Sequence, residues 1–556
     1  MMGLFVAGGV MPVGAQCAPT GSPVDRAYQA RDWNETVRLV QKQDRRSGND
    51  DFEIGMALGH LQRWEEARAA LLEGRRACPQ QERFDIELGG VVFQEKKYGE
   101  AAAWLRRGLR IDPHDQYALD FAGTAYFLSG NIPAALKYWN RVQKPYVEAL
   151  RFDQNLRVER LIVDRAIAFA PAQMLKLSEY EATEARLNGL GIFATHNIRV
   201  SARPGGKFAA ELNAAERNGF GAGRVPALIA VFGGAPYETI YPSYFNIGRS
   251  AMNVESVLRW DAEKRRAWVE ISAPMRKLPQ WRWRMATDER DENWAVRRSF
   301  TGTASELGAV RLSRELLAGS VTGFQTGRLT WSVGGEVSHR AFSRINLGSA
   351  LTPPLVRGGW QVKATSTIEY RLLEVPERRM VVAVGGASEL ARLGANPARL
   401  YEKLQGWERM HWFPQATGDA WELEQRVRAG KTFGVAPFDE LWMLGVERDN
   451  DLWLRGLTGT REGRKGSAPL GDSYFLANNS VYRRAYDNGL VGVKVGPLLD
   501  LGRAAAPASG LAPKEWLVTT GAEAKVTVLG TGVLLTYGHD LRAGTNAFFA
   551  TVAKQF

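Results

Sequence analysis

Residues 449–459 read Asp-Asn-Asp-Leu-Trp-Leu-Arg-Gly-Leu-Thr-Gly and form the centre of a long polar insert, residues 434–472. Gly and charged residues are frequent in the insert, whereas segments of alternating hydrophobic and polar residues lie on both sides of it. Inserts of this length inside a compact domain usually carry function or are disordered. The insert is therefore the first candidate for a functional segment.

The segments around the insert predict a large antiparallel β-sheet in residues 237–556. Each has the two-residue hydrophobic period of a strand and ends at a polar turn. A β-barrel crosses a membrane with strands of about ten such residues, and we expect a transmembrane barrel of about 16 strands here. The predicted strands, of which the last five follow the insert, are 241–249, 253–261, 265–273, 281–287, 293–300, 310–317, 329–339, 360–370, 380–384, 409–413, 420–428, 474–484, 491–501, 516–529, 532–541 and 547–556.

The end of the chain favours a membrane barrel over a soluble β-sandwich. Phe548, Val552 and Phe556 lie on one face of the last predicted strand, and the chain ends on an aromatic residue, as bacterial outer-membrane barrels commonly do. Thirteen of the 17 Trp residues lie after residue 250, often near strand ends. Aromatic girdles at the two membrane interfaces produce this distribution. The core of a sandwich also produces it and is the alternative.

Two short motifs in this half carry a resemblance to a known family. Leu454-Arg455-Gly456-Leu457 resembles the Val/Ile-Arg-Gly-Phe/Tyr loop tip of the BamA/TamA family, in the bacterial surface antigen superfamily. Residues 498–502, Leu-Leu-Asp-Leu-Gly, resemble that family's Phe-x-Asp-x-Gly strand motif and place Asp500 and Gly502 at the matching positions. The residues on either side of Arg455-Gly456 depart from the family pattern and weaken the aromatic packing expected at the tip.

The resemblance implies that the insert folds back into the barrel lumen, where Arg455 would form an ion pair with Asp500. A guanidinium group can give a carboxylate two charge-assisted hydrogen bonds, which a Lys side chain cannot reproduce. Gly456 would let the backbone turn sharply beside the barrel wall. An exposed Arg on a mobile loop is the alternative.

Residues 24–146 contain a repeat of 34 residues. Trp64, Tyr98 and Ile132 open related phrases, and small-residue pairs such as Leu88-Gly89 precede them. The pattern resembles three to four tetratricopeptide repeats (TPR), whose helix pairs stack into a solenoid with a concave face for a partner. The expected packing residues, which include two prolines also 34 residues apart, are Trp64, Ala67, Pro79, Tyr98, Ala101 and Pro113.

Residues 155–218 predict a small α/β domain. Residues 156–163 are β-branched like a strand, 171–190 have a helical apolar stripe, and 193–203 and 208–216 form a hairpin around Pro204-Gly205-Gly206. The segment resembles a single polypeptide-transport-associated (POTRA) domain. The resemblance implies a periplasmic domain that pairs extended substrate strands with an exposed sheet edge; a spacer between the repeats and the barrel is the alternative.

The first residues predict export from the cytoplasm. Residues 1–15 are uncharged and end in Val-Gly-Ala, the small residues that a signal peptidase reads. They lack a positive start, so a buried N-terminal segment is the alternative. Cys17 and Cys78 are too few for a four-ligand metal site. A disulfide between them is possible in an oxidising compartment, although the sequence does not favour it.

Composition excludes several other classes. The chain has 72 Lys and Arg against 60 Asp and Glu, spread over every segment rather than clustered as nucleic-acid binding requires. A barrel lumen or anionic lipid headgroups accommodate this excess. No Gly-x-Ser-x-Gly or His-Glu-x-x-His motif is present. We therefore expect no enzyme, no cofactor and no metal.

Together these patterns predict a multidomain protein of the bacterial outer membrane whose N-terminal domains lie in the periplasm. A monomeric BamA/TamA-type barrel in outer-membrane lipid would insert outer-membrane proteins or translocate extended polypeptides, while the TPR repeats recruit a periplasmic partner or substrate. A single POTRA-like domain favours an accessory or dedicated secretion role. The alternatives are a TPR-fused porin for exopolysaccharide export and a soluble β-rich scaffold.

Overall fold

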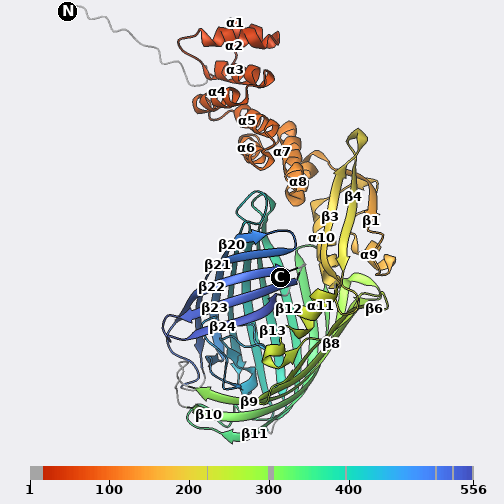
Figure 1. The fold of residues 1–556 in the computed structure, drawn as a ribbon, viewed down its shortest axis with the longest axis vertical. Helices are drawn as coiled ribbons and strands as arrows, with labels where there is room; N and C mark the ends of the chain where they lie inside the picture. Colours follow the sequence, from red (N-terminus) through yellow and green to blue (C-terminus); the bar gives the residue numbers. More distant parts are fainter. Residues whose placement is uncertain are drawn as a thin grey trace, which may run out of the picture. The chain divides into compact units, whose positions relative to one another are not determined.

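The structure is a computed structural model that describes residues 17–221, 223–297, 306–394, 397–506, 510–528 and 531–553. The chain divides into two compact units, Met1–Tyr146 and Val147–Phe556, coloured along the sequence in Figure 1. The predicted signal peptide and Phe556 lie outside the described residues. None of the described helices has the length and hydrophobicity needed to cross a membrane.

The first unit is helical, as predicted, and its helices stack in sequence order (Figure 1). Helices α4, α6 and α8 begin at Trp64, Tyr98 and Ile132, so the 34-residue sequence period is the period of the helix pairs. The helices are α1 (Pro23–Gln29), α2 (Trp33–Gln41), α3 (Gly48–His60), α4 (Trp64–Ala77), α5 (Glu82–Gln94), α6 (Tyr98–Ile111), α7 (Gln116–Leu128) and α8 (Ile132–Trp139), followed by the 3-10 turn η2 (Asn140–Val142).

Close helix contacts recur with the same period. A Cβ atom added to Gly55, Gly89 or Gly123 would lie within 3 Å of a large side chain on the next helix. These side chains, Leu71, Leu105 and Trp139, are also 34 residues apart and fill the space that each glycine leaves. The equivalent of Gly89 in the preceding helix pair, α3 and α4, is therefore Gly55.

The predicted packing residues of the repeats divide into two groups. Ala67 and Ala101 are completely buried, and Trp64 and Tyr98 are half-buried. The two prolines, Pro79 and Pro113, are exposed in the turns that follow α4 and α6, so the prediction that they pack is wrong. Their role is to end each helix pair, because proline has no N–H to continue a helix.

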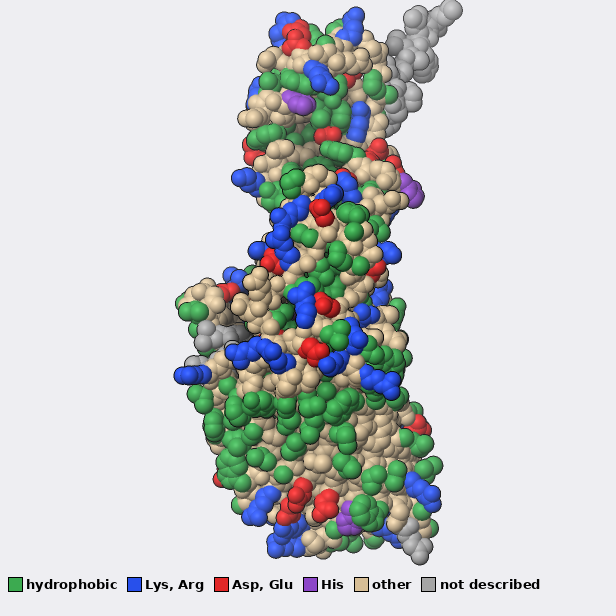
Figure 2. Space-filling model, turned by 90° about the vertical axis from the view of Figure 1, so that its right-hand side faces the viewer, with side chains coloured by type: hydrophobic (Ala, Val, Ile, Leu, Met, Phe, Trp, Pro, Cys, Tyr) green, Lys and Arg blue, Asp and Glu red, His purple; other side chains and the backbone are tan. Residues whose placement is uncertain are grey.

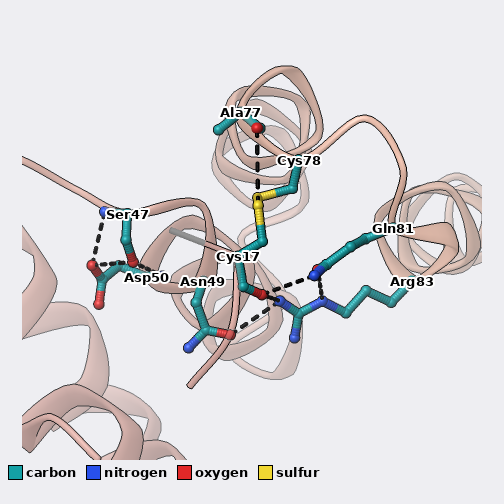
Figure 3. The surroundings of a disulfide bond; sticks show 8 residues. All are labelled: Cys17, Ser47, Asn49, Asp50, Ala77, Cys78, Gln81 and Arg83. Carbon is teal, nitrogen blue, oxygen red and sulfur yellow. Dashed lines mark hydrogen bonds between the residues drawn. A yellow bond between two sulfur atoms is a disulfide. The ribbon is translucent and has the colours of Figure 1, made fainter. Parts of the chain in front are cut away.

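A disulfide joins the start of the described chain to the end of α4. Cys17 and Cys78 are bonded, which corrects the preference of the sequence analysis for unpaired thiols (Figure 3). The Cys17 carbonyl accepts hydrogen bonds from the side chains of Gln81 (3.0 Å) and Arg83 (2.8 Å) on the same side of the helix stack. The N-terminal segment is therefore fixed to the helices by one covalent bond and two hydrogen bonds.

A buried acidic pair lies between α1 and α3. The Asn49 amide donates to Asp25 (2.9 Å) and to Glu53 (3.1 Å), and both carboxyl groups are buried. Burial, together with the hydrogen bond to the neighbouring Asp25 carboxyl, raises the pKa of Glu53 to about 8. Glu53 is therefore protonated in the folded unit at neutral pH but ionised in the unfolded chain.

We expect the helical unit to lose stability as pH rises from about 5 to about 8. Glu53 gives the folded state one proton more than the unfolded state across this window, so its deprotonation favours unfolding by roughly 3 kcal/mol. Burial also raises the pKa of Asp51, to about 6, which adds a smaller loss in the lower part of the window. Glu53→Gln should remove most of the slope, and the exposed Glu73→Gln should leave it unchanged. Thermal unfolding of the full chain at each pH, followed by helical circular dichroism, would show equal slopes in both variants if Glu53 were not responsible.

The second unit begins with the small α/β domain. Its sheet has the order β2-β1-β4-β3, with β1 parallel to β4 and β3 antiparallel to it. The predicted hairpin is confirmed, but the strand predicted over 156–163 is wrong, because α9 covers part of that range and the first strand lies earlier. The elements are β1 (Tyr146–Phe152), α9 (Arg160–Ala166), β2 (Gln173–Met174), α10 (Leu177–Leu190), β3 (Phe193–Ala202), η3 (Pro204–Gly206) and β4 (Phe208–Glu216).

This α/β domain packs on the short turns of the C-terminal sheet. The Arg282 guanidinium donates to the carbonyls of Gly189 (3.2 Å) and Leu190 (2.7 Å) at the end of α10, and Asn253 also donates to Leu190 (3.2 Å). An added Cβ on Gly189 would lie 2.8 Å from the Phe324 ring. The turns that contact the domain therefore mark one end of the sheet, and the insert leaves from the opposite end.

The predicted large antiparallel sheet is confirmed, and its strands follow one another in a barrel order (Figure 1). We call it the large sheet. Its strands are β5 (Thr239–Ile240), β6 (Ser243–Ile247), β7 (Met252–Trp260), β8 (Lys264–Met275), β9 (Leu278–Arg297), β10 (Glu306–Gly323), β11 (Leu329–Asn346), β12 (Gly359–Val375), β13 (Met380–Leu393), β14 (Arg399–Trp412), β15 (Trp421–Gly434), β20 (Ser473–Asp487), β21 (Val491–Ala505), β22 (Leu517–Val528), β23 (Thr531–Asp540) and β24 (Asn546–Ala553). The insert adds one pair of short strands, β17 (Thr460–Arg461) and β18 (Arg464–Lys465).

The described strands occupy fifteen positions along the large sheet. Strand β5 and the first residues of β6, Ser243 and Tyr244, pair with β7 in one register, so β5 and β6 are a single strand interrupted near Pro242. The predicted strands 281–287 and 293–300 are both parts of β9, which runs unbroken from Leu278 to Arg297. Polar residues 288–292 between them made one long strand look like two, because four of the five, Asp288, Arg290, Asp291 and Glu292, form ion pairs.

The outer face of the large sheet is hydrophobic. Figure 2 shows a broad band of hydrophobic side chains on the surface, with charged side chains at its borders. Among the described residues, the exposed large apolar side chains of the sheet include Leu258, Trp260, Ile271, Met285, Val333, Trp360, Val362, Ile368, Leu400, Phe433, Leu499 and Phe548. Soluble monomers rarely expose an apolar area of this extent. Phe548 follows the predicted outward direction in β24.

Candidate functional site

The insert lies against the inner face of the large sheet. Residues 435–472 leave the end of β15, form the 3-10 turn η6 (Phe438–Glu440) and the two-strand pair β16 (Trp442–Met443) and β19 (Leu470–Gly471), and return to β20. Because one segment reaches partners on strands from β7 to β24, the sheet must curve around it. Its sheet partners include Arg259, Arg266, Glu292, Arg314, Arg340, Lys363, Lys403, Arg428, Asn478, Asp500, Glu523 and Phe549.

The structure brings Arg455 onto Asp500. The guanidinium Nε donates to both carboxylate oxygens (3.1 and 2.9 Å), Nη2 makes a second contact to Oδ1, and the Arg455 backbone N–H donates to Oδ2 (3.0 Å). Arg455 is 7% exposed and Asp500 is completely buried. The two-pronged geometry expected from the motif is therefore present, with one backbone hydrogen bond more than expected.

A second carboxylate completes the Arg455 site. Glu523 on β22 accepts a hydrogen bond from Arg455 Nη1 at 2.6 Å, and the same nitrogen donates to the Ser480 hydroxyl at 2.7 Å. Glu523 also accepts from Tyr482 (2.7 Å) and Thr536 (2.8 Å). No motif pointed to Glu523. The only sequence signal was a charged residue at an inward position of a strand next to β21.

The residues beside Arg455 explain the rest of the motif. Leu454 and Leu457 are buried in a hydrophobic cluster with side chains of β20 and β21, so the aliphatic departures from the family pattern still pack. The backbone turns at Arg455-Gly456 as expected, where the Leu457 N–H donates to the Leu454 carbonyl at 3.0 Å, although Gly456 does not have a positive φ. Glycine is needed at this position because there is no room for a side chain: an added Cβ would lie 2.5 Å from the Asp540 backbone nitrogen. A Cβ on Gly502 would lie 3.1 Å from Leu454.

The base of the insert is held by an acidic pair at η6. Glu440 contacts four cations of the inner face, at 3.0 to 3.4 Å, and the adjacent Asp439 contacts two of the same cations. Burial by itself would raise the pKa of the Glu440 carboxyl, but these cations hold that pKa well below its ordinary value. The four cations come from β10, β11, β12 and β14 and are Arg314, Arg340, Lys363 and Lys403.

A third buried ion cluster lies between the base and the tip. Asp449 accepts from Arg259 (2.9 Å), Arg266 (2.6 Å) and Lys465 (2.8 Å), the last of which also contacts Glu292 at 2.6 Å. Burial would raise the pKa of Asp449, but Lys465 and the two arginines hold it well below its usual range. Asp449 opens the quoted stretch and Arg455 lies near its middle, so charge holds the stretch to the sheet at two points.

The charges of the insert and of the inner face are complementary along the sheet. Acidic insert residues meet basic side chains on β7 to β15, whereas the single basic tip residue meets acidic side chains on β21 and β22. A buried charge left without a partner costs several kcal/mol, so this pattern specifies one position of the insert on the inner face, which we call its seat. The insert cannot shift along the inner face without breaking several of these pairs.

One group of described residues has the spacing of metal ligands. His411, Glu422 and Glu424 have ligand atoms within 4.8 Å of one another on the inner face. Lys494 donates to Glu422 (2.7 Å), and Lys525 donates to Glu424 (2.7 Å). The two ammonium groups already occupy the positions beside these carboxylates, so the group is an ion network of the sheet.

Comparisons with known proteins give partial structural likenesses. BamA from Haemophilus ducreyi lacking POTRA domains 1-3 aligns with a TM-score of 0.41 at 12% identity, over 73% of this chain and 84% of that chain. CdiB from Escherichia coli aligns with a TM-score of 0.45 at 13% identity, over 74% and 75% of the two chains. MamA aligns with a TM-score of 0.20 at 18% identity, over 22% and 77%. No family model and no curated protein matches the sequence.

Proposed function

We propose that this chain is a BamA/TamA-type barrel of the bacterial outer membrane that inserts outer-membrane proteins or translocates polypeptides. In this proposal the large sheet closes in lipid with its apolar outer face toward the acyl chains, and the helical repeats recruit a periplasmic partner or substrate. The observation that carries the proposal is the insert, which occupies the inner face through three separate buried ion clusters.

The same observation weighs against the alternative function. An export porin for exopolysaccharide needs a permanently open conduit with a hydrated lining, as large-lumen barrels have. Here the inner face is matched charge by charge to the insert, and residues such as Arg340, Tyr401 and Tyr482 are less than 2% exposed. Conduction of a polymer would require the insert to leave its seat and expose these groups.

The α/β domain supports a role in holding extended polypeptide. Strand β3 is at the edge of its four-stranded sheet, and within the described chain no other strand pairs with its outer side. An edge of ten residues offers alternate N–H and C=O groups to an added strand. We assign this edge as the substrate-pairing surface of a POTRA-like domain.

Single-channel recording tests the proposed filled barrel. The full chain in a planar lipid bilayer should give small, flickering conductance, and removal of residues 435–472 should give a steady conductance several-fold larger, because in this proposal the insert fills the lumen. A steady, wide conductance from the full chain would favour the porin.

A second measurement addresses the cargo. Liposomes that contain the full chain should accelerate the folding of an added unfolded outer-membrane barrel protein, or its appearance inside the liposomes, relative to empty liposomes. A variant with Pro at Ala202 should weaken the effect, because Ala202 is exposed and alternates with Arg203, whose N–H bonds Lys207 across the hairpin, so that the Ala202 N–H faces the free edge of β3. Pro at exposed positions of the α4–α5 turn should leave the effect unchanged. Equal rates with and without the chain would contradict the proposal.

A further inference from the structure

The first helices of three successive repeats, α3, α5 and α7, meet along one face of the helical unit. The Arg83 guanidinium on α5 donates to the Asn49 side chain on α3 at 3.0 Å. Toward α7, the Phe93 ring of α5 packs against the Phe121 ring at 5.0 Å. Arg83 follows Asn49 by one 34-residue period, so the repeat brings equivalent positions together on this face. We call it the repeat face.

Glu87 lies on the repeat face without a charged partner. It follows Glu53 by one 34-residue period and is half-buried, and burial raises the pKa of its carboxyl group. Nothing in the described part of the chain forms an ion pair or a hydrogen bond with this carboxylate. Arg83 is one helical turn away, but its guanidinium donates to Asn49 and, at 2.8 Å, to the carbonyl of the disulfide-bonded Cys17. The one cation of α5 is therefore engaged away from Glu87.

Aromatic side chains surround the Glu87 carboxylate. Burial, followed by the Glu87 charge, raises the pKa of Tyr28 on α1 and of Tyr117 on α7, so the carboxylate is close to both phenols. Tyr117 is 62% exposed, and its ring contacts the Phe121 ring at 5.7 Å. Gly90 leaves open space beside them, since an added Cβ would lie 3.6 Å from Glu87 Oε2 and 3.9 Å from the Phe121 ring. The carboxylate and the exposed rings therefore border one small recess.

We propose that the repeat face binds a Lys or Arg side chain of an extended partner polypeptide, with its charged end on Glu87 and its alkyl chain against Tyr117 and Phe121. A carboxylate accepts charge-assisted hydrogen bonds from such a group, and aromatic rings attract cations. An acidic side chain in the recess would meet the Glu87 charge, and a neutral one would leave that charge unpaired. The proposal rests on the partner-recruiting role proposed for the helical repeats and gives that partner a basic residue.

The binding of two defined peptides to the full chain in nanodiscs of zwitterionic phosphatidylcholine tests the site. The first is the capped peptide Ser-Thr-Ser-Thr-Lys-Thr-Ser-Thr-Ser, and the second has Gln in place of Lys. Saturation-transfer nuclear magnetic resonance, which detects weak binding, should show that the Lys peptide binds about tenfold more tightly, because only its side chain neutralises Glu87. In Glu87→Gln the two peptides should bind equally. Equal binding of both peptides by the parent chain, or binding of neither, overturns the proposal.

Two further variants locate the effect. Glu65→Gln removes the same charge from an exposed position of α4 and should keep the preference for Lys. Gly90→Leu should abolish the preference by covering the carboxylate, without lowering the unfolding midpoint, because leucine favours a helix more than glycine does. A preference for Lys that survives both Glu87→Gln and Gly90→Leu overturns the proposal.

A second copy of this chain is the other possible source of the basic residue. Particles of the parent chain that dissociate on Glu87→Gln, measured by light scattering, would identify that occupant and overturn the assignment to a separate partner. The conductance of the full chain does not involve Glu87. Failure of the peptide test with the expected small, flickering conductance would therefore contradict this inference and leave the proposed filled barrel in place.

Discussion

Arg455→Ala is expected to lower the free energy of unfolding of the second unit by about 3–5 kcal/mol, because removal of one partner leaves the other charges unpaired in a buried site. Asp500 and Glu523 would then face each other without the guanidinium that neutralises both. Arg455→Lys should recover only part of the loss, since one ammonium group cannot reproduce the forked contacts. The measurement is the midpoint of heat unfolding in detergent micelles, followed by gel mobility.

A matched control is Arg464→Ala, which removes a more exposed arginine of the same insert. It should change the midpoint little, as surface ion pairs contribute about 0–1 kcal/mol. If Arg455→Ala behaved like this control, the tip would not be seated as described. A double charge swap of Arg455 and Asp500 is not expected to restore stability, because the new carboxylate would face Glu523. The swap should succeed only when combined with Glu523→Gln.

Glu440→Gln is the second large effect that we expect, again about 3–5 kcal/mol, because four buried cations lose their shared carboxylate. The base of the insert should then leave its seat more often than the tip does. In a planar bilayer this variant should show longer open events than the parent chain. Its thermal midpoint should also fall.

The control for Glu440 is Glu462→Gln in the same insert. Glu462 is exposed and contacts Arg297 at 3.0 Å, so its loss should leave both the midpoint and the open events close to those of the parent. Equal effects of the two substitutions would mean that the base cluster does not hold the insert. Glu440 and Arg455 contact different strands and share no partner, so the effects of the two substitutions on stability should add approximately.

Regular patterns in the sequence predicted the elements whose signal is local. The alternation of side chains located nearly every strand of the large sheet, and the 34-residue period located α4, α6 and α8 to the residue. The motif around Arg455 led to Asp500 because each lies in a short recognisable phrase. These signals survive because they depend only on neighbours along the chain.

The sequence predictions failed where tertiary packing determines the structure. Residues 160–166 are β-branched, yet Ile162 and Val163 are buried on a helix beside the α/β sheet, so local preference was overridden. Strand β1 pairs in parallel with β4, more than fifty residues later, and gives no hairpin signal. The partners of Asp449 and Glu440 lie on strands distant in sequence, and each looked like any polar residue at an inward position.

The seat of the insert also constrains the order in which a newly made chain can reach its final form. The tip contacts β21, β22 and β23 through Asp500, Glu523 and the Asp540 backbone, and Trp453 packs against Phe549 of β24 at 4.8 Å. All of these partners are synthesised after the insert. The nascent protein therefore passes through a stage in which the tip lacks its partners, whereas Glu440 and Asp449 can already contact strands made before the insert. Any factor that delays the last hairpin prolongs that stage.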